Sequence, residues 1–204
     1  MSALRLPPTL PGWPVVLLGL LPLAWPFLSN ALDFQIDPAR AWVHQTGNTA
    51  TWLLVATLCM TPLQRWTGWA GWIRWRRVLG LLTFAYVTLH LLAFTGLWQE
   101  FDIARLVRET GKRPYLWVGL SAWLLLLPLA LTSTRAAQRR LGRRWKTLHQ
   151  LVYVVTGLAI WHQAWAHKVG LMGVWPAAAA LTILLLWRLW GRFSRKKTAV
   201  GREV

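Results

Sequence analysis

Charged residues are scarce in this sequence, and acidic residues are scarcer still. Only 14% of its 204 residues are charged, and six are Asp or Glu. A soluble globular domain has about 25% charged residues, so this chain has too few to cover a water-facing surface. It also has a single cysteine, Cys59, which excludes a disulfide within the chain. The composition therefore excludes an ordinary soluble domain and a disulfide-stapled secreted one.

Long uncharged stretches take the place of a polar surface. Six runs of 19 to 27 residues contain no Asp, Glu, Lys or Arg. About 20 helical residues cross the hydrocarbon core of a bilayer. The pattern predicts an all-α, polytopic membrane protein: a bundle of six transmembrane helices forming a single domain over residues 1–204. The expected spans are approximately 11–31, 44–64, 78–98, 114–134, 147–166 and 170–190.

The basic residues, which give a formal net charge of +17, are concentrated in alternate connections. They follow spans two, four and six, whereas the other connections hold acids such as Asp33, Asp37, Glu100, Asp102 and Glu109. This alternation is the positive-inside pattern and predicts that both termini are cytoplasmic. Membrane insertion explains the basicity, so we expect contact with membrane lipid and no nucleic-acid partner.

Three histidines, His90, His149 and His162, lie inside the uncharged runs. An ionisable side chain in hydrocarbon is costly, and its default interpretation is a functional site. Neutral imidazole is a common axial ligand of haem iron. The histidines therefore favour a membrane cytochrome b, and the haem must be non-covalent because the chain has no C-x-x-C-H motif.

The depth of two histidines in the membrane can be counted along ideal helices. His90 lies about 20 Å beyond Arg77, and His162 lies about 24 Å beyond Lys146. Both are expected in the outer half of the bilayer, at similar heights on spans three and five. We predict that they are the two axial ligands of one haem between these spans.

His149 lies only three residues beyond Lys146, close to the cytoplasmic face. It can hold a second haem if the helix bends, if the iron is five-coordinate, or if another residue completes the ligand set. In that case Arg76 and Arg77 can pair with the propionates of this second haem. Alternatively, His149 is an interhelical hydrogen-bonding residue.

A group of basic residues is expected near the cytoplasmic ends of spans three and five. Such a group can hold haem propionates or the phosphate of FMN, and it can dock an acidic flavoprotein. The alternative is that these charges serve membrane insertion alone. The residues are Arg76, Arg77, Arg143, Arg144 and Lys146.

Four segments together resemble the ferric-reductase-like transmembrane superfamily and, within it, the haem-binding membrane subunits of bacterial methionine-sulfoxide reductase systems. The resemblance covers nearly the whole chain. The segments are Arg76-Arg77-Val78-Leu79-Gly80-Leu81 leading to Tyr86 and Leu89-His90, Arg113-Pro114-Tyr115, the run 128–133, and the run 145–153 from Trp145 to Tyr153.

This resemblance implies a bacterial inner-membrane protein with b-type haem and FMN. It also implies electron transfer from quinol, or from a cytoplasmic flavin reductase, to a periplasmic molybdopterin enzyme that reduces methionine sulfoxide in oxidised periplasmic proteins. His90, His149 and His162 match the haem-associated histidines of the family. The chain itself is then an electron-transfer subunit rather than the catalytic one.

The same sequence features allow two alternatives to this interpretation. One is a small transporter or channel in which the histidines relay protons or bind a transported metal. That alternative predicts acidic residues within the spans, and there are none. The other is a different ferric-reductase-like electron carrier, which shares the haem ligands but has another acceptor.

Overall fold

The structure is a computed structural model and describes residues 11–31, 37–166 and 175–200. Every regular element in these residues is a helix, which confirms the all-α class. The elements are α1 (Trp13–Leu20), the short 3-10 helix η1 (Leu21–Leu23), α2 (Ala24–Ala31), α3 (Pro38–Thr67), α4 (Gly71–Leu92), the π-helical η2 (Ala93–Trp98), α5 (Ile103–Lys112), α6 (Tyr115–Leu131), α7 (Arg135–Leu141), α8 (Arg143–Leu148), α9 (Leu151–Ala166) and α10 (Trp175–Val200).

Helix α3 shows how local chemistry sets the helix ends. The Asp37 carboxylate accepts a hydrogen bond from the Arg40 amide at 3.0 Å, and Pro38 occupies the first helical turn. Both features favour a helix N-terminus. At the other end Gly68 adopts a left-handed conformation with φ of 70°, which ends the helix at Thr67.

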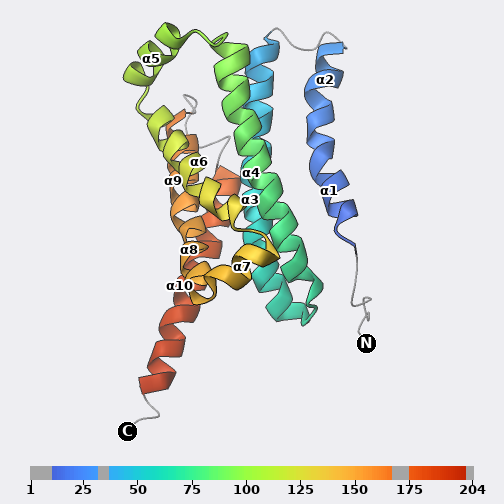
Figure 1. The fold of residues 1–204 in the computed structure, drawn as a ribbon, viewed down its shortest axis with the longest axis vertical. Coiled ribbons are helices and arrows are strands. Elements are labelled where there is room, and N and C mark those ends of the chain that lie inside the picture. The colour runs from blue at the N-terminus through green and yellow to red at the C-terminus, as the bar shows by residue number, and fades with distance from the viewer. Residues whose placement is uncertain (1–10, 32–36, 167–174, 201–204) are drawn as a thin grey trace.

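The helices form an elongated bundle (Figure 1). Helices α3 and α4 pack along each other at its centre, and α1 lies against α4. On the other side α6 packs on α9, and α10 contacts both α9 and α3. Helix α5 lies at the end of the bundle opposite to α7 (Figure 1). The histidine-bearing helices α4 and α9 therefore belong to two different helix pairs, α3–α4 and α6–α9.

Each predicted span corresponds to helical structure. The segment from α1 to α2 covers most of 11–31, α3 covers 44–64, α4 with η2 covers 78–98, and α6 covers most of 114–134. Residues 170–174 of the sixth predicted span lie outside the described residues, and α10 begins at Trp175. The helical segment Gly71–Trp98 is long and apolar enough to cross a membrane by itself, whereas α5 and α6 meet that criterion only as a pair bent by 107°. The count of six spans therefore stays a prediction.

The fifth predicted span differs from the structure at its start. The sequence predicts one helix over 147–166, but α8 ends at Leu148 and α9 begins at Leu151. The Trp145 indole donates to the Thr132 carbonyl at 2.9 Å, and the His149 ring contacts the Thr132 hydroxyl at 3.1 Å. These contacts tie the segment to the end of α6, and His149 lies in the turn between two helices.

Buried side chains join the two helix pairs. Leu58, Leu126, Val155 and Leu181 come from α3, α6, α9 and α10 and form one apolar cluster. Between the pairs, the Trp123 indole on α6 donates to a threonine hydroxyl of α4 at 3.1 Å. The relative positions of α4 and α9 are therefore fixed by packing on both sides.

Candidate functional site

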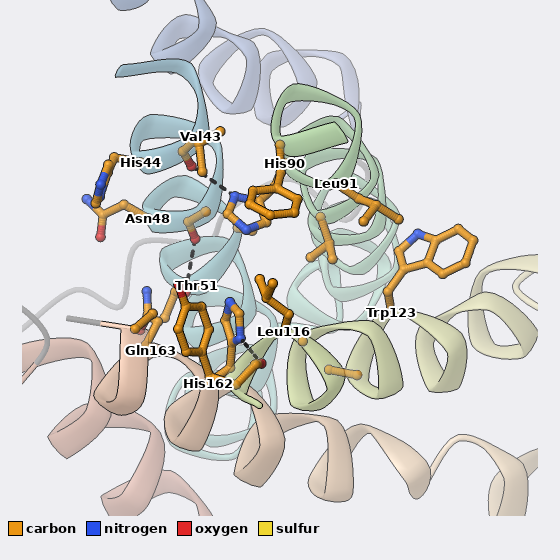
Figure 2. Close-up of a pocket in the computed structure, with 18 of the residues that line it drawn as sticks. Val43, His44, Asn48, Thr51, His90, Leu91, Leu116, Trp123, His162 and Gln163 are labelled. Carbon is orange, nitrogen blue, oxygen red and sulfur yellow. Dashed lines mark hydrogen bonds between the residues drawn. The ribbon is translucent and has the colours of Figure 1, made fainter. Parts of the chain in front are cut away.

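His90 on α4 and His162 on α9 lie next to each other in the bundle. Their ring centroids are 6.2 Å apart and their planes are nearly perpendicular, at 85°. Figure 2 shows that the two rings approach from opposite sides of a pocket and that a nitrogen of each faces the other ring. The structure thus brings together the two histidines that were predicted at the same depth, and their role as ligands stays a prediction.

Hydrogen bonds fix the tautomer of both rings. His90 Nδ1 lies 2.9 Å from the Val43 carbonyl, and His162 Nδ1 lies 2.8 Å from the Tyr115 carbonyl. A carbonyl only accepts, so Nδ1 must carry the proton and donate in both neutral rings. Nε2 then keeps the lone pair that a metal needs, and a backbone carbonyl on the other nitrogen is the usual way to orient such a ligand.

The spacing of the two rings fits a single metal ion between them. An imidazole nitrogen lies about 2 Å from a bound metal, so two imidazoles on opposite sides of one ion have centroids about 6 Å apart. The observed 6.2 Å agrees with this value. Among the described residues, no group of three or more His, Cys, Asp or Glu side chains can hold a bare metal ion. Two protein ligands suit haem iron, because the porphyrin supplies the other nitrogens.

The rings border an outer cavity of about 1280 Å³, which is at the large end for small-molecule sites. Its lining is mainly apolar and aromatic, but it also includes the charged residues Asp37, Arg40 and Arg113 and polar residues such as His44 and Gln163. His44 and Gln163 lie beside the histidine pair (Figure 2). The outer cavity therefore offers a large planar ligand mainly apolar walls and two facing imidazoles.

A second, inner cavity of about 700 Å³ lies at the end of the bundle near α7. It contains His149, and four arginines line it, whereas no carboxylate is found among its described lining residues. This donor set suits an anionic group. The arginines are Arg74, Arg76, Arg77 and Arg135.

The predicted basic group is therefore only partly assembled around this cavity. Arg76 and Arg77 line it together with His149. By contrast, Arg143, Arg144 and Lys146 are exposed on α8 and are not among the lining residues that the structure describes. The structure thus separates Arg76 and Arg77, which line the cavity although Arg77 is itself exposed, from the basic residues of α8.

His149 has the opposite tautomer to the outer pair. Its Nε2 lies 3.1 Å from Thr132 Oγ1, and this hydroxyl donates its only proton to the Pro128 carbonyl at 2.6 Å. The hydroxyl must then accept, so His149 Nε2 carries a proton and Nδ1 is the acceptor nitrogen. The ring also stacks on Trp145, with centroids 4.0 Å apart. This arrangement holds Nε2 in a hydrogen bond and does not present it to a metal.

The two cavities follow each other along the same helices. On α4 the inner cavity ends at Phe84 and the outer cavity begins at Val87. On α6 the inner cavity ends at Leu126 and the outer cavity begins at Trp123. Each pair is separated by about one helical turn, or roughly 5 Å. Redox groups in the two cavities would therefore be close neighbours.

Helix α5 forms part of the wall at the outer end. Leu106 and Val107 line the outer cavity, and the three ion pairs found among the described residues all involve α5 or its flanks. Asp102 caps the helix by accepting from the Arg105 amide at 2.9 Å. This backbone hydrogen bond lowers the pKa of the Asp102 carboxyl. The acidic residues Glu100, Asp102 and Glu109 thus stabilise helix α5 beside the outer cavity.

Several site residues were not predicted from the sequence. They are the Val43 and Tyr115 carbonyls, which cannot be recognised from residue type, and Thr132, which fixes the His149 ring. Arg74 and Arg135, which line the inner cavity, are also absent from the predicted site residues, although both flank predicted spans. A signal did exist for the carbonyls, because each precedes its histidine by the same 47 residues.

The chain is similar to a family of transmembrane proteins and to several named relatives. Residues 46–160 match the family described as ferric reductase like transmembrane component. The chain is 42% identical over 179 residues to a protein of Xanthomonas axonopodis pv. citri, covering 88% of this chain and 81% of the relative. It is 45% identical to a Cronobacter sakazakii protein, covering 84% and 87%, and 38% identical to a Polaromonas naphthalenivorans protein, covering 93% and 88%. All three are named protein-methionine-sulfoxide reductase heme-binding subunit MsrQ.

The chain belongs to the MsrQ family. This confirms the resemblance inferred from the sequence motifs. The matched family region begins in α3 and ends in α9. It contains His90 and His149, whereas His162 lies two residues beyond its end. No solved structure matches the chain, and the geometry of the histidine pair therefore comes from this structure alone.

Proposed function

We propose that this MsrQ-family chain is a membrane cytochrome b that carries electrons outward to a periplasmic methionine-sulfoxide reductase. In this proposal b-type haem binds between α4 and α9, the third and fifth of six transmembrane spans in a single domain. The observation that carries it is the facing pair His90 and His162, with Nε2 as the lone-pair nitrogen of both rings. The names of the relatives, which describe heme-binding subunits, support the same cofactor.

The chain's own residues hold and insulate the redox centre. His90 and His162 would hold the haem through their Nε2 atoms, and the Val43 and Tyr115 carbonyls orient the rings. When bound, the haem iron supplies one-electron transfer between its ferric and ferrous states. The aromatic and apolar side chains of the outer cavity would limit the access of water to the site.

We assign the inner cavity to the arrival of electrons. The donor is membrane quinol or a cytoplasmic flavin reductase. Arg76 and Arg77, beside His149, suit a haem propionate or the phosphate of FMN. The exposed Arg143, Arg144 and Lys146 suit the docking of an acidic flavoprotein. In this scheme His149 serves the inner site, and it would hold a second haem either through Nδ1 or after Nε2 leaves Thr132.

The membrane orientation follows from the charges. The basic helices α7 and α8 lie at the cytoplasmic side of a bacterial inner membrane, and α5 lies at the periplasmic side. Both termini are then cytoplasmic. The histidine pair is closer to the α5 end of the bundle, as the residues of α5 in the outer cavity indicate. Electrons at this site are well placed for a periplasmic molybdopterin enzyme, and the chain acts as the electron-transfer subunit of that enzyme.

A reduced-minus-oxidised visible spectrum of the purified protein tests the cofactor. We expect a low-spin b-type spectrum, and we expect acidic acetone to extract the haem, because the only cysteine cannot form a covalent attachment motif. A colourless but folded protein from haem-replete cells would overturn the proposal.

The direction of transfer is tested in proteoliposomes of known orientation. The haem is reduced anaerobically, and the periplasmic reductase with its methionine-sulfoxide substrate is added on the α5 side or on the α7 side. We expect reoxidation only from the α5 side. Reoxidation only from the α7 side would reverse the proposed topology.

A further inference from the structure

Each of the facing histidines lies against a glycine of the neighbouring helix. A Cβ added at Gly47 on α3 would lie 2.9 Å from His90 Nδ1 and 3.0 Å from its Cε1. A Cβ added at Gly119 on α6 would lie 2.7 Å from His162 Cε1 and 2.8 Å from its Nδ1. Such distances are shorter than real Cβ contacts, so alanine at either position would displace the ring or the helix.

The two glycines belong to the same local arrangement, which occurs once in each helix pair. The carbonyl that binds the histidine precedes it by 47 residues in both pairs. Val43 lies four residues before Gly47, and Tyr115 lies four residues before Gly119. In an α-helix a carbonyl points toward the amide four residues later. A glycine there leaves the second lone pair of the carbonyl accessible to a ring from another helix.

The backbone does not require glycine at either position. The only glycines with positive φ among the described residues are Gly68 and Gly142, so Gly47 and Gly119 have conformations that alanine adopts. Both lie inside helices, where glycine is less favourable than alanine. The contact with the histidine ring is therefore the physical reason for glycine at both positions.

We propose that Gly47 and Gly119 are positioning residues for the two axial imidazoles. Each glycine exposes the carbonyl that binds Nδ1–H and provides the space in which the ring edge lies. Together they set the orientation of the rings and the angle of 85° between their planes. This inference rests on the proposed function, since it concerns how the histidines bind haem.

The test compares Gly47→Ala and Gly119→Ala in the full-length protein purified with haem. We expect the haem affinity of each variant to fall about tenfold or more, as is typical when the groups that orient a metal-binding histidine are disturbed. Haem that remains bound should show a shifted largest g value in its low-spin EPR signal, because that value depends on the angle between the imidazole planes. The midpoint potential should shift as well.

Two helical glycines that line neither cavity serve as matched controls. Nothing lies within 4 Å of a Cβ added at Gly157 on α9 or at Gly111 on α5. Gly157→Ala and Gly111→Ala should keep the wild-type haem affinity, EPR signal and potential. Equal losses in these controls would overturn the specific role of Gly47 and Gly119.

A second comparison separates positioning from folding. In a His90→Ala background the ring is gone, so Gly47→Ala should leave thermal stability unchanged or raise it. A clear loss of stability in that background would overturn the proposal, because the glycine would then serve the helix packing itself. If the wild-type protein binds no haem, the proposed function fails. If it binds low-spin haem and both alanine variants match it, the positioning inference alone fails.

Discussion

The outer and inner cavities use the same residue type in opposite ways. In the outer cavity His90 and His162 donate from Nδ1 to backbone carbonyls, and their rings face each other at 6.2 Å. In the inner cavity His149 donates from Nε2 to a threonine hydroxyl, and its neighbours are arginines. A histidine buried in a membrane protein is thus not a haem ligand by its type alone. The nitrogen that its hydrogen bond leaves as the acceptor distinguishes the two cases.

The largest effect is expected from the loss of either histidine of the outer pair. His90→Ala and His162→Ala should each reduce bound haem by roughly tenfold or more, because removal of either imidazole leaves the iron with one protein ligand. The measurement is the haem-to-protein ratio with the reduced-minus-oxidised spectrum. His44→Ala is the matched control, since His44 lines the same cavity outside the ring pair. A wild-type spectrum in either ligand variant would refute the bis-histidine site.

A smaller effect is expected from the inner arginines. Arg76→Gln with Arg77→Gln should slow haem reduction by a quinol analogue roughly tenfold, as expected for lost hydrogen bonds to an anion. The rate is measured by stopped-flow spectroscopy in nanodiscs. The exposed pair Arg143→Gln with Arg144→Gln should change that rate less and should slow reduction by an acidic flavoprotein more. Identical rates in all variants with both donors would mean that these arginines serve membrane insertion alone.

His149→Ala sharpens the comparison because its effect on the outer site should be slight. We expect the outer haem spectrum and content to change less than about twofold, since separated sites act nearly independently. The measurement is the same spectrum used for His90 and His162. If His149→Ala instead removes as much haem as His90→Ala, the ring must act as a ligand, through Nδ1 or after leaving Thr132.

The smallest effect concerns helix α5 at the outer cavity. The lowered pKa of Asp102 means that its charged form favours the fold, so the cap stabilises α5 above the carboxyl's unfolded pKa and is lost as pH falls through the lower folded pKa. Hydrogen exchange of the α5 amides should become faster on acidification relative to Asp102→Asn, which caps without titrating. A difference between the two proteins that is independent of pH would contradict this assignment.

Much of the candidate site could be predicted from the sequence, because depth in a membrane is a one-dimensional quantity. Counting residues from the basic boundary puts His90 and His162 at one height and His149 at another. The same counting fails at residues 147–150, where it predicts a continuous helix. The contacts of Trp145 and His149 with Thr132, at the end of α6, interrupt it there.

The sequence by itself determined the helical class, the family, the basic and acidic ends, and the histidines at matching depth. These properties follow from composition and from spacing along single helices. Only the tertiary structure decided which nitrogen of each ring is the acceptor, that two glycines lie against the rings, and that Arg76 and Arg77 line a cavity while Arg143 and Arg144 do not. The physical reason is that hydrogen-bond partners and cavities depend on how separate helices are rotated and packed against each other. The spacing of residues within one helix does not determine that rotation.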